Sequence, residues 1–303
     1  MNSRSVLISL LVFFSLTIIG FMVWWTDLEF SQPERVTARF NGIRALRDVS
    51  YQTSLGPRTV GSDAHNQVVI WIQTKLREAN WYVEIQSAEA KKKPITNIIA
   101  RRLDMPPQII LAAHYDSRLF ADHDPDPDKQ QQPVPGANDG ASGVAVLLEL
   151  ARTLPNGTVP IWLVFFDAED NGGIPGWDWI LGSRAFVGRY NVRPDAVVVI
   201  DMVGDRDLKI FIEKRSNPDL AAEIWAQAAE LGYGDTFIST PKYNILDDHV
   251  PFLEAGIRAV DIIDMDYPYW HTTADTEDKV SERSLTIVGK ILWTWVVQQS
   301  QKP

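Results

Sequence analysis

Short apolar segments that alternate with helical segments restrict the fold of this chain more than any other feature. Residues 161–166, 196–200 and 259–263 are apolar almost throughout, which is typical of strands whose two faces are both covered. The segments 141–154 and 217–231 are predicted to be helices. Strands and helices in alternation indicate a sheet that is sandwiched between helices, in one α/β/α domain.

Weaker patterns extend this alternation over the rest of the chain. We find no internal repeat and no linker within residues 36–300, so a single domain is predicted. Further strands are expected at residues 81–88, 96–101, 108–113 and 209–213. Further helices are expected at residues 36–54, 182–190 and 281–299, and after the capping residues Ser62 and Asp63.

The N-terminal segment is uncharged from residue 6 to residue 25, a run of 20 residues. At about 1.5 Å per residue, a helix of this length spans the ~30 Å hydrocarbon core of a bilayer. Arg4 precedes the run and Asp27 follows it, so a cytoplasmic N-terminus is predicted. We therefore expect a single-pass membrane protein, with one transmembrane helix in residues 1–30 and the folded domain, residues 31–303, on the extracytoplasmic side. A cleaved signal peptide and a buried core helix are the alternatives.

The composition excludes several kinds of site. The chain of 303 residues contains no cysteine, which rules out disulfides, thiolate metal ligands and cysteine nucleophiles. Its formal net charge is −10 and it has no long stretch of lysine and arginine, so nucleic acid is not expected as a partner.

Histidine and acidic residues follow the ends of the predicted strands. His114 and Asp201 come directly after apolar strands, and Asp170 lies shortly after another. His271 lies a short loop beyond the last strand, and Asp139 precedes a predicted helix in a glycine-rich loop. Ligands of open α/β sheets bind outside the carboxyl ends of the strands, so these five side chains are expected to converge.

Each of these residues has a simpler interpretation when it is taken alone. A single aspartate at the end of a strand is usually a turn residue or a helix cap, and a single histidine is usually on the surface or satisfied in the core. Together, however, five carboxylate and imidazole groups at one sheet edge need a cation to offset their charge. Histidine and carboxylate ligation without cysteine suits catalytic zinc.

Two more acidic residues stand beside the expected ligands. Glu169 precedes Asp170, and a glutamate that stays off the metal is the usual general base near a metal-bound substrate. Asp116 lies two residues after His114 on the same side of a strand, where it is expected to orient the imidazole. A turn with Ser117 is the alternative for Asp116.

Six short motifs give the chain a resemblance to a known superfamily, the zinc aminopeptidases and the glutaminyl cyclases that share their fold. The motifs are AHYDSR (113–118), GANDGASG (136–143), FFDAED (165–170), IDMVGD (200–205), DDHVPF (247–252) and WHTTADT (270–276). The resemblance covers roughly residues 36–300. It implies a single three-layer α/β/α sandwich with a mixed, mostly parallel central sheet, and a zinc-dependent catalytic domain.

The aminopeptidase branch implies two zinc ions. The position of Asp139 bridges the two ions, and the position of Glu169 is the general base. The positions that hold the two ions are those of His114, Asp139, Asp170, Asp201 and His271.

The cyclase branch implies one zinc ion, held at the positions of Asp139, Asp170 and His271. Glu169 then shuttles a proton, while Asp201 and Asp247 form a hydrogen-bonded acidic pair. Asp170 departs from the family pattern, which more usually has glutamate at this position, so we expect metal binding to be retained with a shifted geometry.

Several residues favour the cyclase branch. Trp270 before His271 resembles a tryptophan of the cyclase substrate pocket, and DDHVPF has aspartate where the peptidases commonly have serine. Trp177 is expected to add a second aromatic wall, with core packing as the alternative. The implied reaction converts the N-terminal glutamine of a peptide or protein to pyroglutamate and releases ammonia. A zinc aminopeptidase is the alternative, and a binding protein that has lost catalysis is a third possibility.

The segment at residues 120–135 is rich in aspartate, proline and glutamine. Its aspartates are spaced as calcium ligands can be, but Pro125 and Pro127 break any resemblance to an EF-hand. A solvated, flexible loop at the rim of the site is therefore predicted, with His123 exposed.

Overall fold

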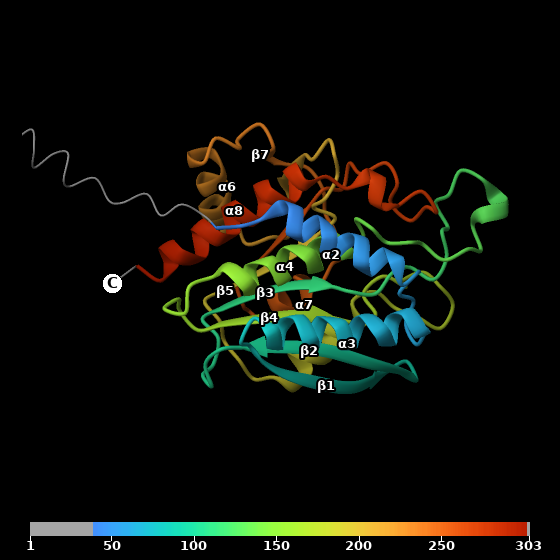
Figure 1. Ribbon diagram of the computed structural model, residues 1–303, viewed down its shortest axis with the longest axis horizontal. Coiled ribbons are helices and arrows are strands. Elements are labelled where there is room, and N and C mark those ends of the chain that lie inside the picture. Colours follow the sequence, from blue (N-terminus) through green and yellow to red (C-terminus); the bar gives the residue numbers. More distant parts are fainter. Residues whose placement is uncertain (1–38, 302–303) are drawn as a thin grey trace, which may run out of the picture. The chain divides into compact units, whose positions relative to one another are not determined.

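The computed structural model describes residues 39–301, whose fold is shown in Figure 1. Strands β4 (Ile161–Phe166), β3 (Ile109–His114), β5 (Ala196–Asp201) and β8 (Ala259–Ile263) run parallel to one another, whereas β1 (Tyr82–Ala90) and β2 (Lys93–Arg101) pair antiparallel at one edge of the sheet. The mixed, mostly parallel sheet is therefore confirmed. The order of the strands across the sheet is β1, β2, β4, β3, β5 and β8.

Helices cover both faces of the sheet, and alternate residues of its strands belong to different cores. Leu163 and Phe165 of β4 lie in the larger core, whereas Val164 and Phe166 lie in the smaller one. Figure 1 shows α2, α4 and α8 gathered on one side of the sheet. The larger core is formed with α2 (Gly42–Ser54), α3 (Asp63–Glu78), α4 (Ala141–Thr153), α6 (Pro218–Glu230) and α8 (Glu282–Gln299), and the smaller with α5 (Leu181–Arg189) and α7 (Val250–Glu254).

The first described helix is shorter than the pattern of residues 36–54 predicts. Helix α2 begins at Gly42 because Asn41 caps it, its side chain accepting a hydrogen bond from the backbone N–H of Arg44. A Cβ atom at position 42 would lie 2.0 Å from Oγ1 of Thr286, so the glycine permits the close approach of α2 to α8.

Two small elements were not expected from the sequence. Strand β7 (Phe237–Pro241) pairs in parallel with β6 (Ile210–Ile212), but Phe237 is its one buried residue, so no apolar run marks it. Helix α7 has five residues, too few to show helical periodicity. The 3₁₀ helices η1 (Pro127–Lys129) and η2 (Glu277–Lys279) lie in loops.

The transmembrane helix expected in residues 1–30 lies outside the described residues. Among residues 39–301, no helix combines the length and the apolar character that crossing a membrane requires.

Candidate active site

The carboxyl ends of the parallel strands border a cavity of about 330 Å³. Most of the residues that the sequence singled out line it, although they come from distant parts of the chain. His114 is the last residue of β3 and is not among the lining residues. The acidic and histidine residues of the cavity wall are Asp139, Glu169, Asp170, Asp201, Asp247 and His271.

His114 and four of the lining side chains form two clusters that share one aspartate. In the first, Nε2 of His271 lies 2.8 Å from Oδ1 of Asp170 and 3.8 Å from Oδ2 of Asp139. In the second, Nε2 of His114 lies 3.1 Å from Oδ1 of Asp139 and 3.1 Å from Oδ1 of Asp201. Within each cluster, one ligand atom from every residue lies within 4.8 Å of the others. The geometry therefore offers two adjacent groups of possible metal ligands, with Asp139 in both.

The chemistry of these clusters fits a bound cation. Oδ2 of Asp139 and Oδ2 of Asp170 are buried and have no hydrogen-bond partner among the described residues. Burial and the charge of Asp139 raise the pKa of Asp170 well above its ordinary value. Burial also raises the pKa of Asp201 to about 7, against the opposing effect of His114. Buried carboxylate oxygens held close to the Nε2 atoms of His114 and His271 match the ligands of zinc.

Asp116 contacts His114 and the backbone of Glu169 and Asp170. Its Oδ1 lies 3.4 Å from Nδ1 of His114, and the carboxylate accepts hydrogen bonds from the backbone N–H groups of Glu169 (3.1 Å) and Asp170 (3.4 Å). These contacts agree with the predicted orientation of His114 by Asp116, and they also fix the backbone that carries Glu169.

Asp275 supports Asp139 in the same way. Its carboxylate accepts hydrogen bonds from the backbone N–H groups of Asn138 (2.9 Å) and Asp139 (3.2 Å), and from the hydroxyl of Tyr267 (2.7 Å). The sequence pattern did not single out Asp275, although this residue lies in the WHTTADT motif. A carboxylate that binds only backbone and a tyrosine has no distinguishing spacing in the sequence.

Three residues at the site adopt the left-handed backbone conformation that non-glycine residues rarely adopt. They are Ala168 (φ 52°), which precedes Glu169, Met202 (φ 46°), which follows Asp201, and His271 itself (φ 56°). Each such residue costs on the order of 1–3 kcal/mol, and such residues gather at functional sites.

Glu169 has the environment of a general base. Its side chain lines the cavity, and among the described residues it belongs to none of the groups that could hold a metal. Burial and the charge of Asp247 raise its pKa well above the usual value. A carboxyl group with a raised pKa can both accept and return a proton near neutral pH.

Asp247 connects the cavity to a further buried acidic residue. Asp247, His249 and Asp261 each offer an atom within 4.8 Å of the other two. Burial and the neighbouring Asp247 raise the pKa of Asp261 well above its usual value, and Asp247 also contributes to the raised pKa of Asp201. The acidic pair expected from Asp201 and Asp247 therefore has a third neighbour, Asp261, which the sequence did not single out.

Glu213 lies behind His249 in a dense set of hydrogen bonds. Its Oε2 lies 3.1 Å from Nε2 of His249 and accepts from the backbone N–H groups of Arg215 (2.9 Å) and Ser216 (2.7 Å). Burial opposes ionisation, but these hydrogen bonds outweigh it and lower the pKa of Glu213 to about 2.

We predict that Glu213→Gln lowers the free energy of unfolding by about 3 kcal/mol near pH 6, since a pKa lowered by some two units stabilises the ionised fold. The contribution is present above the pKa of the unfolded chain, about 4.5, and is lost as the pH falls towards 2. Urea unfolding of both proteins between pH 2 and pH 7 measures it. A stability difference that does not shrink in acid would contradict the assignment.

Two tryptophans form the aromatic wall of the cavity. The ring of Trp179 stacks on that of His271 at 5.9 Å between centroids, and the ring of Trp270 stacks on it at 3.8 Å. A Cβ atom at Gly172 would lie 2.0 Å from the Trp179 ring, so this glycine lets the tryptophan pack beside the site.

Trp177, which the sequence predicted for this wall, is not among the lining residues. It packs beside the small cluster around Leu181, and Nζ of Lys93 lies 4.6 Å from its ring centroid. Trp179, two residues later, takes the expected place. A run of two tryptophans separated by one residue does not reveal which of them faces the cavity.

Comparison with known proteins decides the family. The sequence profile of peptidase family M28 matches residues 97–296. The chain belongs to peptidase family M28. The superfamily that the six motifs indicated is thereby confirmed.

Solved structures of similar proteins carry two kinds of description. A glutaminyl cyclase from Porphyromonas gingivalis is 33% identical to this M28 chain, with a TM-score of 0.81 over 86% of this chain and 99% of the other. A Zn-dependent exopeptidase from Parabacteroides distasonis is 30% identical, with a TM-score of 0.80 over 85% and 98%. Among sequence relatives, the glutaminyl-peptide cyclotransferase of Boiga irregularis is 25% identical over 90% of this chain and 88% of its own length.

Proposed function

We propose that this chain is a zinc-dependent glutaminyl cyclase, which converts the N-terminal glutamine of a peptide or protein to pyroglutamate. The observation that carries the proposal is the buried Glu169 beside a three-residue ligand cluster, in a cavity walled by Trp179 and Trp270. The similarity to glutaminyl cyclases over nearly their whole length supports it. The activity is assigned to the domain at residues 31–303.

The ligands proposed for zinc are Asp139, Asp170 and His271, the cluster that opens onto the cavity. When bound there, zinc acts as a Lewis acid that polarises the γ-carbonyl group of the substrate glutamine. The similarity to a Zn-dependent exopeptidase supports the choice of metal.

The cyclisation requires one proton transfer, which we assign to Glu169. The α-amine nitrogen of the substrate attacks its γ-carbonyl carbon, and the bond from this carbon to the amide nitrogen breaks. Glu169 takes a proton from the attacking amine and gives it to the departing nitrogen, which leaves as ammonia. Its raised pKa suits both halves of this transfer.

Asp201 and Asp247 are proposed to share a proton beside Glu169. The pKa of Asp201, raised by burial to about 7, keeps this group partly protonated near neutral pH. A protonated carboxyl can donate a hydrogen bond to the reacting amide, and it adds no further negative charge next to Glu169.

One observation favours an aminopeptidase as the second candidate. His114, Asp139 and Asp201 form a further ligand cluster beside the first, as a second zinc ion requires. Glu169 would then take a proton from a water molecule that attacks the first peptide bond. Without a second ion, His114 lies between Asp139 and Asp201; burial lowers its pKa, but these aspartates outweigh burial and hold the pKa well above the usual value.

The aromatic wall can be tested with a matched pair of variants. Trp179→Ala is expected to raise KM for glutaminyl peptides about 5-fold, since one good aromatic contact contributes on the order of 1 kcal/mol. Trp177→Ala removes the same side chain outside the cavity and should leave KM unchanged. Steady-state kinetics of both variants measure KM. A raised KM in Trp177→Ala with an unchanged KM in Trp179→Ala would instead place Trp177 in the wall.

The proposed function itself is tested with the full chain loaded with zinc. An N-terminal glutaminyl peptide and a matching leucyl peptide are offered separately, and ammonia and free amino acids are measured. Ammonia from the first with no free leucine from the second is expected. Release of leucine would favour the aminopeptidase.

A further inference from the structure

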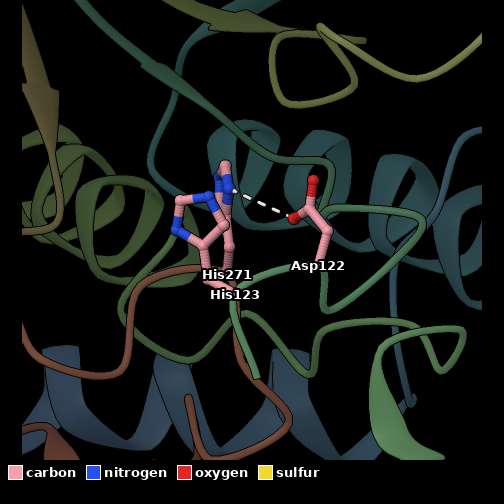
Figure 2. Close-up of side chains that lie close together, drawn as sticks. All are labelled: Asp122, His123 and His271. Carbon is pink, nitrogen blue, oxygen red and sulfur yellow. Dashed lines mark ion pairs between the residues drawn. The ribbon is translucent and has the colours of Figure 1, made fainter. Parts of the chain in front are cut away.

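We infer that Asp122 is a positioning residue that fixes the imidazole of His271 for metal binding. The inference rests on the zinc site proposed above. Oδ1 of Asp122 lies 3.6 Å from Nδ1 of His271, and Figure 2 shows the carboxylate facing the ring. Nε2 of the same ring lies 2.8 Å from Oδ1 of Asp170, so the two nitrogen atoms face two different carboxylates.

The two nitrogen atoms of His271 must differ in protonation when a metal binds. Nε2 faces Asp139 and Asp170 and must offer its lone pair, so the ring proton has to sit on Nδ1. Nδ1 is buried and has no hydrogen-bond partner within residues 39–301. Asp122 is the carboxylate that faces it, and a carboxylate in this place favours the tautomer with the proton on Nδ1.

Asp122 is itself held in a defined orientation by Arg118. Its two oxygens accept hydrogen bonds from Nε (2.7 Å) and Nη2 (2.5 Å) of the guanidinium. The buried Arg118 also donates from Nη1 to the backbone carbonyl of Asp170 (2.9 Å) and from Nη2 to that of Gly172 (3.1 Å). Arg118 thus connects Asp122 to the backbone of Asp170, which is another proposed zinc ligand.

The neighbours of Asp122 hold this part of the loop against the segment that carries His271. The backbone N–H of His123 donates to the carbonyl of His271 (3.2 Å), and its ring lies edge-on to Trp270 at 4.5 Å. Asp124 accepts from the backbone N–H (2.9 Å) and the hydroxyl (2.6 Å) of Thr273. His123 is exposed, as predicted, but Asp124 is buried, so this end of the loop is anchored rather than solvated.

Asp122, His123 and His271 also offer atoms close enough to hold a metal of their own. We favour the positioning role because both oxygens of Asp122 are already bound to Arg118. His271 would also have to bind metals through both nitrogen atoms at once, which requires loss of the ring proton.

The test compares Asp122→Asn with the wild-type chain by zinc titration against a chromophoric chelator. Loss of such a carboxylate partner is expected to weaken zinc binding about 10–100-fold. Asp128→Asn changes the charge equally on an exposed residue of the same loop and should bind zinc like the wild type. Asp122→Glu, which keeps the carboxylate, should recover part of the affinity.

Nitrogen NMR of the zinc-loaded protein measures a signal that would not change if Asp122 only stabilised the fold. The Nδ1–H signal of His271 should shift in Asp122→Asn and stay in place in Asp128→Asn. Equal zinc affinity in Asp122→Asn and wild type would overturn the inference and leave the proposed function intact. A wild-type chain that binds no zinc would overturn the metal site itself, whereas zinc binding without cyclase activity would overturn only the proposed reaction.

Discussion

Glu169→Gln is expected to lower kcat/KM for an N-terminal glutaminyl peptide by about 10²–10⁴-fold, the usual contribution of a general acid–base group. Glutamine has nearly the same shape but cannot take the proton of the attacking amine. The side chain belongs to none of the possible metal-ligand groups among the described residues, so zinc content should not change. Kinetics and metal analysis of the same preparation measure both quantities.

A matched control distinguishes this role from a general loss of charge. Glu254→Gln removes an exposed carboxylate that pairs with Arg184, and it should retain full activity. Turnover of Glu169→Gln within a few-fold of the wild type would refute the proton transfer assigned to Glu169. Loss of zinc from this variant would instead make Glu169 a ligand.

Asp139→Ala is expected to abolish zinc binding and activity together. Asp139 belongs to both ligand clusters, and in the described part of the chain its buried Oδ2 has no hydrogen-bond partner. Without the Asp139 carboxylate, the first cluster has only two possible ligands left, His271 and Asp170. Metal analysis after dialysis and the ammonia assay measure the two losses.

His114→Ala separates the one-zinc account from the two-zinc account. His114 belongs to the second cluster alone, so a cyclase with one zinc ion should keep its metal when this residue is lost. A fall from two ions to one would support the aminopeptidase alternative. Retention of stoichiometric zinc by Asp139→Ala would contradict both accounts of the site.

The ligand clusters were open to prediction because sheet geometry brings strand ends together. His114 and Asp201 end β3 and β5, and the residues after β4 and β8 reach the same edge. Apolar strands covered on both faces are also marked clearly in the sequence, and β4 and β8 have the bounds that were expected.

The supporting residues could not be predicted, because their contacts depend on loops that the sequence does not describe. Asp122 meets His271 across 149 positions of the chain, and Asp275 meets Asp139 across 136. The choice of Trp179 over Trp177 likewise depends on the path of one loop. The left-handed residues Ala168 and Met202 are not glycines, so nothing in their identity signals the conformation.

The central claim is that the substrate's own amine attacks the glutamine side chain, whereas in a peptidase water attacks the first peptide bond. It is tested most directly by mass spectrometry of an N-terminal glutaminyl peptide turned over by the zinc-loaded chain in water labelled with heavy oxygen. The account predicts a product that has lost ammonia, has kept all its residues and contains no heavy oxygen. Free glutamine, with heavy oxygen in its newly formed carboxylate, would contradict the account and identify a peptidase.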